Sequence, residues 1–158
     1  MIQNEPLIGP VELTAFAQRC EEQLLHSNKV EVLYPKGTSL TNWNPDDIKA
    51  INFQLLEGLR NAGNVYALFV SDPNNESAWV VHYVGERKSI GLRQRLTEHL
   101  IKKNHQTGSM LKNVQAAVAE GKRISVAYIK VQPEALRLFV EESIISRNIR
   151  NLPWNTHG

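Results

Sequence analysis

The chain has 158 residues, of which 42% are hydrophobic and 22% are charged, and its formal net charge is +2. These values are typical of one globular domain with its own core. No apolar run approaches the ~18 residues of a membrane span, and MIQNEPLIGP lacks the basic and apolar regions of a signal peptide. We therefore expect a cytoplasmic protein without a membrane partner. Cys20 is the only cysteine, which excludes an internal disulfide and a cysteine-based zinc site.

The spacing of apolar residues alternates between helical and strand-like periods along the chain. The clearest helix has Asn44 as its cap, Pro45 in its first turn and Gly63 beyond its end. The segment SDPNNES at 71–77 predicts a generous loop between two strands, not a tight turn. In chain order we predict a helix at 10–26, a strand at 29–34, a helix at 44–63, strands at 64–70 and 78–87, helices at 91–103 and 109–121, a strand at 123–131 and a helix at 133–148.

This order predicts an α+β fold with a small, mostly antiparallel, three-stranded sheet flanked by helices. Residues 1–62 are expected to form an N-terminal extension, helix-strand-helix, packed on the core. Residues 63–158 are expected to form the domain that carries the functional motifs.

Charge is distributed unevenly along the chain. Residues 1–59 are net acidic, whereas 86–130 are strongly basic, and such a basic segment suits either a polyanion or a solvated helix face. The basic side chains of this segment are Arg87, Lys88, Arg93, Arg95, Lys102, Lys103, Lys112, Lys122, Arg123 and Lys130. Among them, Arg87, Lys88, Arg93, Lys102 and Lys103 are candidates for contacts with a nucleic-acid backbone.

The tripeptides NVY at 64–66 and YVG at 83–85 lie in neighbouring predicted strands. An arginine with a histidine four residues later follows on the next helix, a glutamate lies on a late helix, and an asparagine ends the segment LPWN. This arrangement resembles the GIY-YIG nuclease family and covers most of residues 63–155. The resemblance implies a site made of Tyr66, Tyr83, Arg95, His99, Glu141 and Asn155.

Two of these assignments have rivals. Arg93 competes with Arg95, because two residues more than is usual separate Gly85 from the arginine, and the histidine at +4 favours Arg95. Glu142 competes with the adjacent Glu141, and the apolar pair that follows in EESII favours Glu141.

A phosphodiester-cleaving mechanism can be written with these residues. Glu141 would hold Mg²⁺ or Mn²⁺, a hard cation that accepts carboxylate, phosphate and water ligands. Arg95 would stabilise the charge that develops on the phosphate. Tyr66 would act as base or base relay with His99 as the competing base, while Tyr83 would orient the water or phosphate.

The same resemblance assigns hydrogen bonding of a tyrosine or phosphate oxygen to Asn155. The sequence therefore predicts a metal-dependent endonuclease acting on DNA, of a restriction or defence type. Two alternatives remain open: a toxin-like ribonuclease that uses the same site, and a nucleic-acid-binding module without hydrolysis. Residues 1–62 are net acidic and are expected to pack on the core away from the DNA face. Self-association through this segment would form a homodimer that can cut both strands, and the alternative is a monomer in which the segment only completes the core.

Overall fold

The computed structural model describes residues 10–103 and 108–155; the residues on which the signal-peptide argument rests lie largely outside these ranges. It confirms an α+β chain. Its elements are α1 (Pro10–His26), β1 (Val30–Val32), α2 (Pro45–Ile51), α3 (Phe53–Gly58), β2 (Val65–Asp72), β3 (Asn75–Glu86), η1 (Ser89–Gly91), α4 (Leu92–Leu100), α5 (Leu111–Ala119), β4 (Ile124–Ile129), η2 (Glu134–Leu136), α6 (Arg137–Asn148) and η3 (Ile149–Asn151).

The sheet has four strands in the order β1-β4-β2-β3, and every neighbouring pair is antiparallel. The prediction of three strands was wrong because β1 belongs to the sheet. This short strand pairs with β4, with Val30 opposite Val126 and Val32 opposite Ile124. The N-terminal segment therefore completes one edge of the sheet, which satisfies backbone groups of β4 that would otherwise lack partners.

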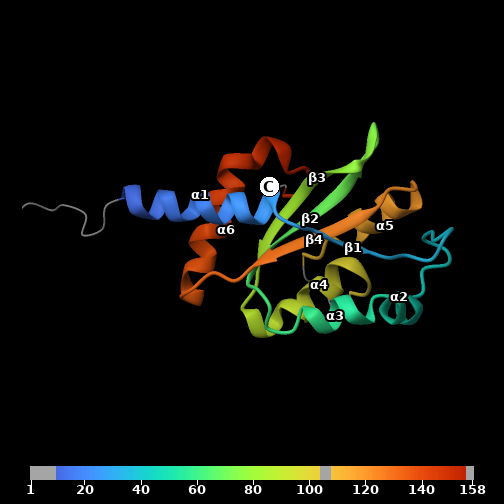
Figure 1. Cartoon of the computed structure of the whole chain (residues 1–158). Helices are drawn as coiled ribbons and strands as arrows, with labels where there is room; N and C mark the ends of the chain where they lie inside the picture. The colour runs from blue at the N-terminus through green and yellow to red at the C-terminus, as the bar shows by residue number, and fades with distance from the viewer. Residues whose placement is uncertain (1–9, 104–107, 156–158) are drawn as a thin grey trace, which may run out of the picture.

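Helices cover both faces of the sheet (Figure 1). Strand β2 is central, and its residues from Val65 to Ser71 are all buried, as expected for a strand enclosed on two sides. Tyr66, Leu68 and Val70 point into the core formed with α2 to α5. Val65, Ala67 and Phe69 point into the core formed with α1 and α6. The alternation of side chains along one strand thus joins the two cores.

Two local predictions were wrong. The predicted helix at 44–63 is two helices, because Asn52 interrupts it. The side-chain amide of Asn52 instead bonds to the backbone just after β1: Leu33 N donates to Asn52 Oδ1 at 2.8 Å, and Asn52 Nδ2 donates to Leu33 O at 2.8 Å. The predicted loop at 71–77 is a tight turn, since Asp72 pairs with Asn75 and Asp72 Oδ1 accepts from the backbone N–H of Asn74 at 2.8 Å.

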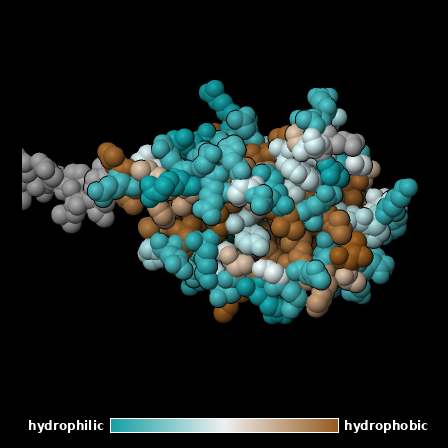
Figure 2. Space-filling model, viewed as in Figure 1, coloured by the Kyte–Doolittle hydropathy of each residue, from teal (hydrophilic) through white to brown (hydrophobic). Residues whose placement is uncertain are grey.

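The visible surface is mixed. Hydrophilic side chains cover much of it and hydrophobic ones lie between them (Figure 2). Over residues 10–103 and 108–155, no helix has both the length and the apolar character required to cross a membrane.

Candidate active site

An open cleft of about 580 Å³ lies where β2 begins and β3 ends. One wall is formed by η1 and the start of α4, and the other by α6, which approach each other at one end of the sheet (Figure 1). Four of the residues predicted from the two tripeptides and the helices line this cleft: Tyr66, Tyr83, Arg95 and Glu141.

The second tripeptide has its glycine for a steric reason. Gly85 lies opposite Tyr66 in the β2–β3 ladder, and the Tyr66 ring lies across it. A Cβ atom at residue 85 would lie 2.5 Å from Tyr66 Oη and 2.6 Å from Cζ, distances that real Cβ contacts do not show. Gly85 therefore allows the phenol to reach the cleft along the strand surface.

The second tyrosine lies on the same face of the sheet as the first by ordinary strand alternation. Gly85 is opposite Tyr66, and Tyr83 lies two residues before Gly85, so its side chain points to the same side. A bulge with His82 as the extra residue lies beyond this regular stretch and does not change that side. The rings of Tyr66 and Tyr83 have centroids 6.3 Å apart, and both residues line the cleft.

His99 is fully buried and holds Tyr66. Its Nδ1 accepts the backbone N–H of Met110 at 2.9 Å, and its Nε2 lies 2.7 Å from Tyr66 Oη. A neutral ring whose Nδ1 accepts a hydrogen bond carries its proton on Nε2. His99 is therefore the donor to Tyr66 Oη, and the phenol proton of Tyr66 is left to point elsewhere.

Burial controls the protonation of these groups. The pKa of His99 falls to about 3, first because of burial and then because of the positive charges of Arg95 and Arg87. Burial raises the pKa of both Tyr66 and Tyr83, against an opposing effect of Arg95. At neutral pH the histidine is uncharged and both phenols keep their protons.

The structure separates the two candidate arginines. Arg95 lines the cleft, where it is close enough to Tyr66 and Tyr83 to oppose the rise in their pKa values, and its Nη1 donates to Glu98 Oε1 at 3.0 Å. Arg93 lies in a separate groove between α3 and α4, with its Nη2 3.4 Å from Glu57 Oε2. Arg95 is the arginine that shares a cleft with the tyrosines.

The adjacent glutamates also diverge. Glu141 lines the cleft, whereas Glu142 is exposed and faces a depression beside α1. The pKa of Glu141 rises to about 7, chiefly through burial and then through the neighbouring charges of Glu86 and Glu142. Glu86 itself accepts from Arg137 Nε at 2.8 Å, and both residues line the same cleft.

The donor set of the cleft fits a hard cation that keeps most of its waters. Glu141 and Glu86 supply carboxylate oxygens, and a cation would offset both the burial and the neighbouring negative charge that raise the pKa of Glu141. Among the described residues, no group of three or more His, Cys, Asp or Glu side chains is arranged to hold a metal. This set suits Mg²⁺ or Mn²⁺ better than an ion that requires a complete protein cage.

No family model, no curated protein and no solved structure matches the chain. The residues in the cleft are therefore the basis on which a function can be proposed.

Asn155 is placed outside the cleft. Its Oδ1 accepts from Val84 N at 2.8 Å and its Nδ2 donates to Val84 O at 2.9 Å, so its amide is used by the backbone of β3. Among the predicted backbone contacts, Arg87 and Lys88 line the cleft, Arg93 and Lys102 line the α3–α4 groove, and Lys103 is exposed.

Three residues of this region were not predicted from the sequence. Glu86 directly follows YVG and Arg137 precedes Glu141 by one helical turn, so the spacing of both could have indicated that they lie at the cleft. Asn64 gave no such signal: its amide exchanges hydrogen bonds with the backbone of Val131 at 2.9 and 2.8 Å and so joins the start of β2 to the end of β4.

Proposed function

We propose that the chain is a metal-dependent endonuclease of the GIY-YIG type that hydrolyses phosphodiester bonds in DNA. The observation that carries the proposal is the presence of Tyr66, Tyr83, Arg95 and Glu141 in one cleft. These residues come from two strands and two helices that are far apart in the sequence. Their side chains supply a general base, a cationic donor and a metal ligand within one open site.

Arg95 would bind the scissile phosphate. Its guanidinium donates to Glu98 Oε1 at 3.0 Å and to Gly108 O at 3.4 Å and lies beside both phenols, so it is fixed at the cleft. An arginine fork directed at a phosphate stabilises the negative charge that grows on the oxygens in the transition state. Arg87 and Lys88 at the mouth of the cleft would hold the flanking backbone.

Tyr66 would align the attacking water and, after releasing its own phenol proton to solvent in the open cleft, would accept the water's proton as a phenolate. In the resting protein the phenol is neutral, because burial raises its pKa. The Nε2–H of His99 and the guanidinium of Arg95 both favour its phenolate. His99 would thus act through Tyr66 as a positioning residue, and Tyr83 would orient the water or the phosphate.

Glu141 would hold the cation, with Glu86 as the neighbouring carboxylate. A bound Mg²⁺ or Mn²⁺ would polarise the phosphate and stabilise the leaving oxygen. Arg137 keeps Glu86 paired at 2.8 Å and so limits the negative charge beside Glu141.

The test is incubation of the purified protein with Mg²⁺ or Mn²⁺ and, in parallel, supercoiled plasmid, linear duplex DNA and structured RNA. We expect nicking or linearisation of plasmid, loss of activity in EDTA, and little cleavage of RNA. Cleavage of RNA alone would replace the DNA assignment with a ribonuclease, and binding without cleavage of any substrate would leave a non-catalytic module.

A matched pair of variants ties the activity to the cleft. Glu141→Gln removes a carboxylate that lines it, whereas Glu142→Gln changes the adjacent, exposed residue. We expect the first variant to lose at least about 10²-fold in rate and the second to keep nearly full activity. Equal loss in both variants would contradict the assignment of the metal ligand.

A further inference from the structure

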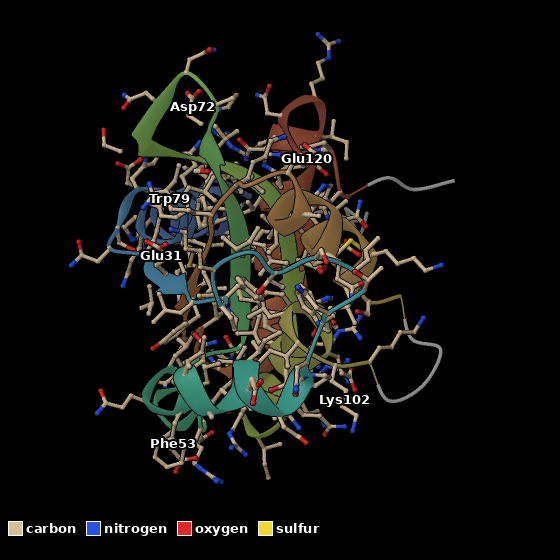
Figure 3. The ribbon with its side chains drawn as sticks, turned by 90° about the vertical axis from the view of Figure 1, so that its right-hand side faces the viewer. Glu31, Phe53, Asp72, Trp79, Lys102 and Glu120 are labelled. Atoms are coloured by element: carbon tan, nitrogen blue, oxygen red, sulfur yellow. The ribbon has the colours of Figure 1, made fainter. Side chains whose placement is uncertain are left out.

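A second concave surface lies next to the cleft. It is a groove of about 450 Å³ between α3 and α4, lined on one side by Lys49, Arg60 and Asn61 and on the other by Arg93, Thr97 and Lys102. Figure 3 shows Lys102 at the same lower edge of the molecule as α2 and α3. The groove is therefore built jointly by the N-terminal segment and the helix that carries Arg95.

The charge of the groove is positive after its acids are counted. Glu57, on α3, is paired with two arginines that line the groove, Arg60 at 3.1 Å and Arg93 at 3.4 Å. Glu98 faces it from α4 and is paired with Arg95 at 3.0 Å. Because both acids are paired with arginines, Lys49 and Lys102 on opposite walls leave the groove with net positive charge. Such a surface is complementary to a phosphate backbone.

The groove and the cleft share a boundary residue. Ile90 lines both of them and is 88% exposed. It belongs to η1, directly before the helix whose residues Arg93 and Arg95 face the groove and the cleft respectively. An exposed branched side chain at this boundary offers an apolar surface to sugars and bases between two phosphate-binding regions.

We propose that the α3–α4 groove binds the DNA backbone on one side of the scissile phosphate, with the strand crossing Ile90 on its way out of the cleft. This inference rests on the proposed function and assigns a substrate-binding role to Lys49, on α2, and Arg60, which follows α3. It reverses the expectation that the acidic N-terminal segment lies away from the DNA, because net charge over a segment does not describe the face that the segment presents.

The first test compares DNA binding by the full chain and by the double variant Lys49→Gln/Lys102→Gln. Fluorescence anisotropy of a labelled 20-base-pair duplex is measured in EDTA, so that hydrolysis does not interfere, over a range of salt concentrations. Loss of two phosphate contacts should lower the slope of log K against log salt by about 2 and weaken binding at low salt by roughly tenfold per contact.

Matched variants isolate the groove. Lys36→Gln/Lys122→Gln removes the same charge from a different depression and should leave the salt slope unchanged. Glu57→Gln removes the acid that competes for Arg60 and Arg93 and should tighten binding. Ile90→Ala should weaken binding without changing the slope, because an apolar contact releases no counterions; Leu40→Ala, also at an exposed residue, serves as its control.

The outcomes separate this inference from the proposed activity. Equal affinity and equal salt slope for wild type and Lys49→Gln/Lys102→Gln would overturn the proposal that the groove binds DNA, whether or not the protein cleaves plasmid. Binding that depends on the groove, without cleavage, would support this proposal and reject the proposed nuclease activity. Tighter groove-dependent binding to RNA than to DNA would overturn the choice of DNA, and no binding of wild type to either would overturn the groove altogether.

Discussion

Glu141→Gln is expected to make the metal-free protein more stable at alkaline pH as well as inactive. The pKa of Glu141 in the fold is about 7, against an ordinary value of 4.5. A carboxyl group whose pKa is raised by folding contributes fully to stability below pH 4.5, where it is protonated in both the folded and the unfolded state. This contribution is lost as pH rises through 7, because the folded protein must then hold the ionised carboxylate. Glutamine resembles the protonated acid at every pH.

The difference in pKa corresponds to an upper limit of roughly 3 kcal/mol, which solvent screening of the half-buried group reduces to about 1–2 kcal/mol. We compare the free energy of unfolding of Glu141→Gln with that of wild type at each pH. The difference in favour of the variant should be about 1–2 kcal/mol larger at pH 8 than at pH 4.5. Urea unfolding of both proteins in EDTA at the two pH values measures this difference.

Adding Mg²⁺ provides a second measurement that does not depend on cleavage. A cation that binds the folded state raises its melting temperature, by an amount that grows with the logarithm of its affinity. We expect Mg²⁺ to stabilise wild type and Glu142→Gln but not Glu141→Gln. If the stability difference between wild type and Glu141→Gln did not change with pH, the raised pKa of Glu141 would be refuted.

Three further predictions concern the residues around Tyr66. His99→Gln should lose less stability in acid than wild type. The pKa of His99 falls from 6.5 to about 3 on folding, so the free energy of unfolding of wild type decreases by up to about 1.4 kcal/mol per pH unit below 6.5. An equal loss of stability between pH 7 and pH 5 in both proteins would contradict this. Gly85→Ala should cost about 1–3 kcal/mol by displacing the tyrosine ring, measured by thermal unfolding against Gly58→Ala, where an added Cβ meets nothing within 4 Å. Arg95→Lys should lower kcat by at least about 10²-fold while Arg93→Lys mainly weakens DNA binding; the reverse pattern would exchange their roles.

Spacing along the sequence predicted most helices and strands, but not the interruption at Asn52 or the tight turn after Asp72. The resemblance favoured Arg95 over Arg93 and Glu141 over its neighbour, and the two favoured residues line the cleft. Helical periodicity alone did not separate the adjacent glutamates, because both have apolar neighbours on the helix.

Long-range hydrogen bonds were not predictable in the same way. Asn52 looks like any polar residue of a helix, yet its bonds to Leu33 break that helix and position β1. The proton position on His99 depends on a backbone N–H from Met110, which no sequence pattern reveals. The resemblance assigned Asn155 a hydrogen bond to a tyrosine or phosphate oxygen, whereas in the fold its amide bonds to the backbone of Val84, a partner that only the fold specifies.

The bonds between the C-terminal segment and β3 have a consequence for solubility. Strand β3 is at the edge of the sheet, where unpaired backbone groups invite another chain to add a strand. Asn155 occupies both backbone groups of Val84, and Trp154 N donates to His82 O at 3.0 Å. Trp154 and Asn155 thus shield the edge of the sheet beside Tyr83, and truncation before Trp154 should expose that edge and promote aggregation.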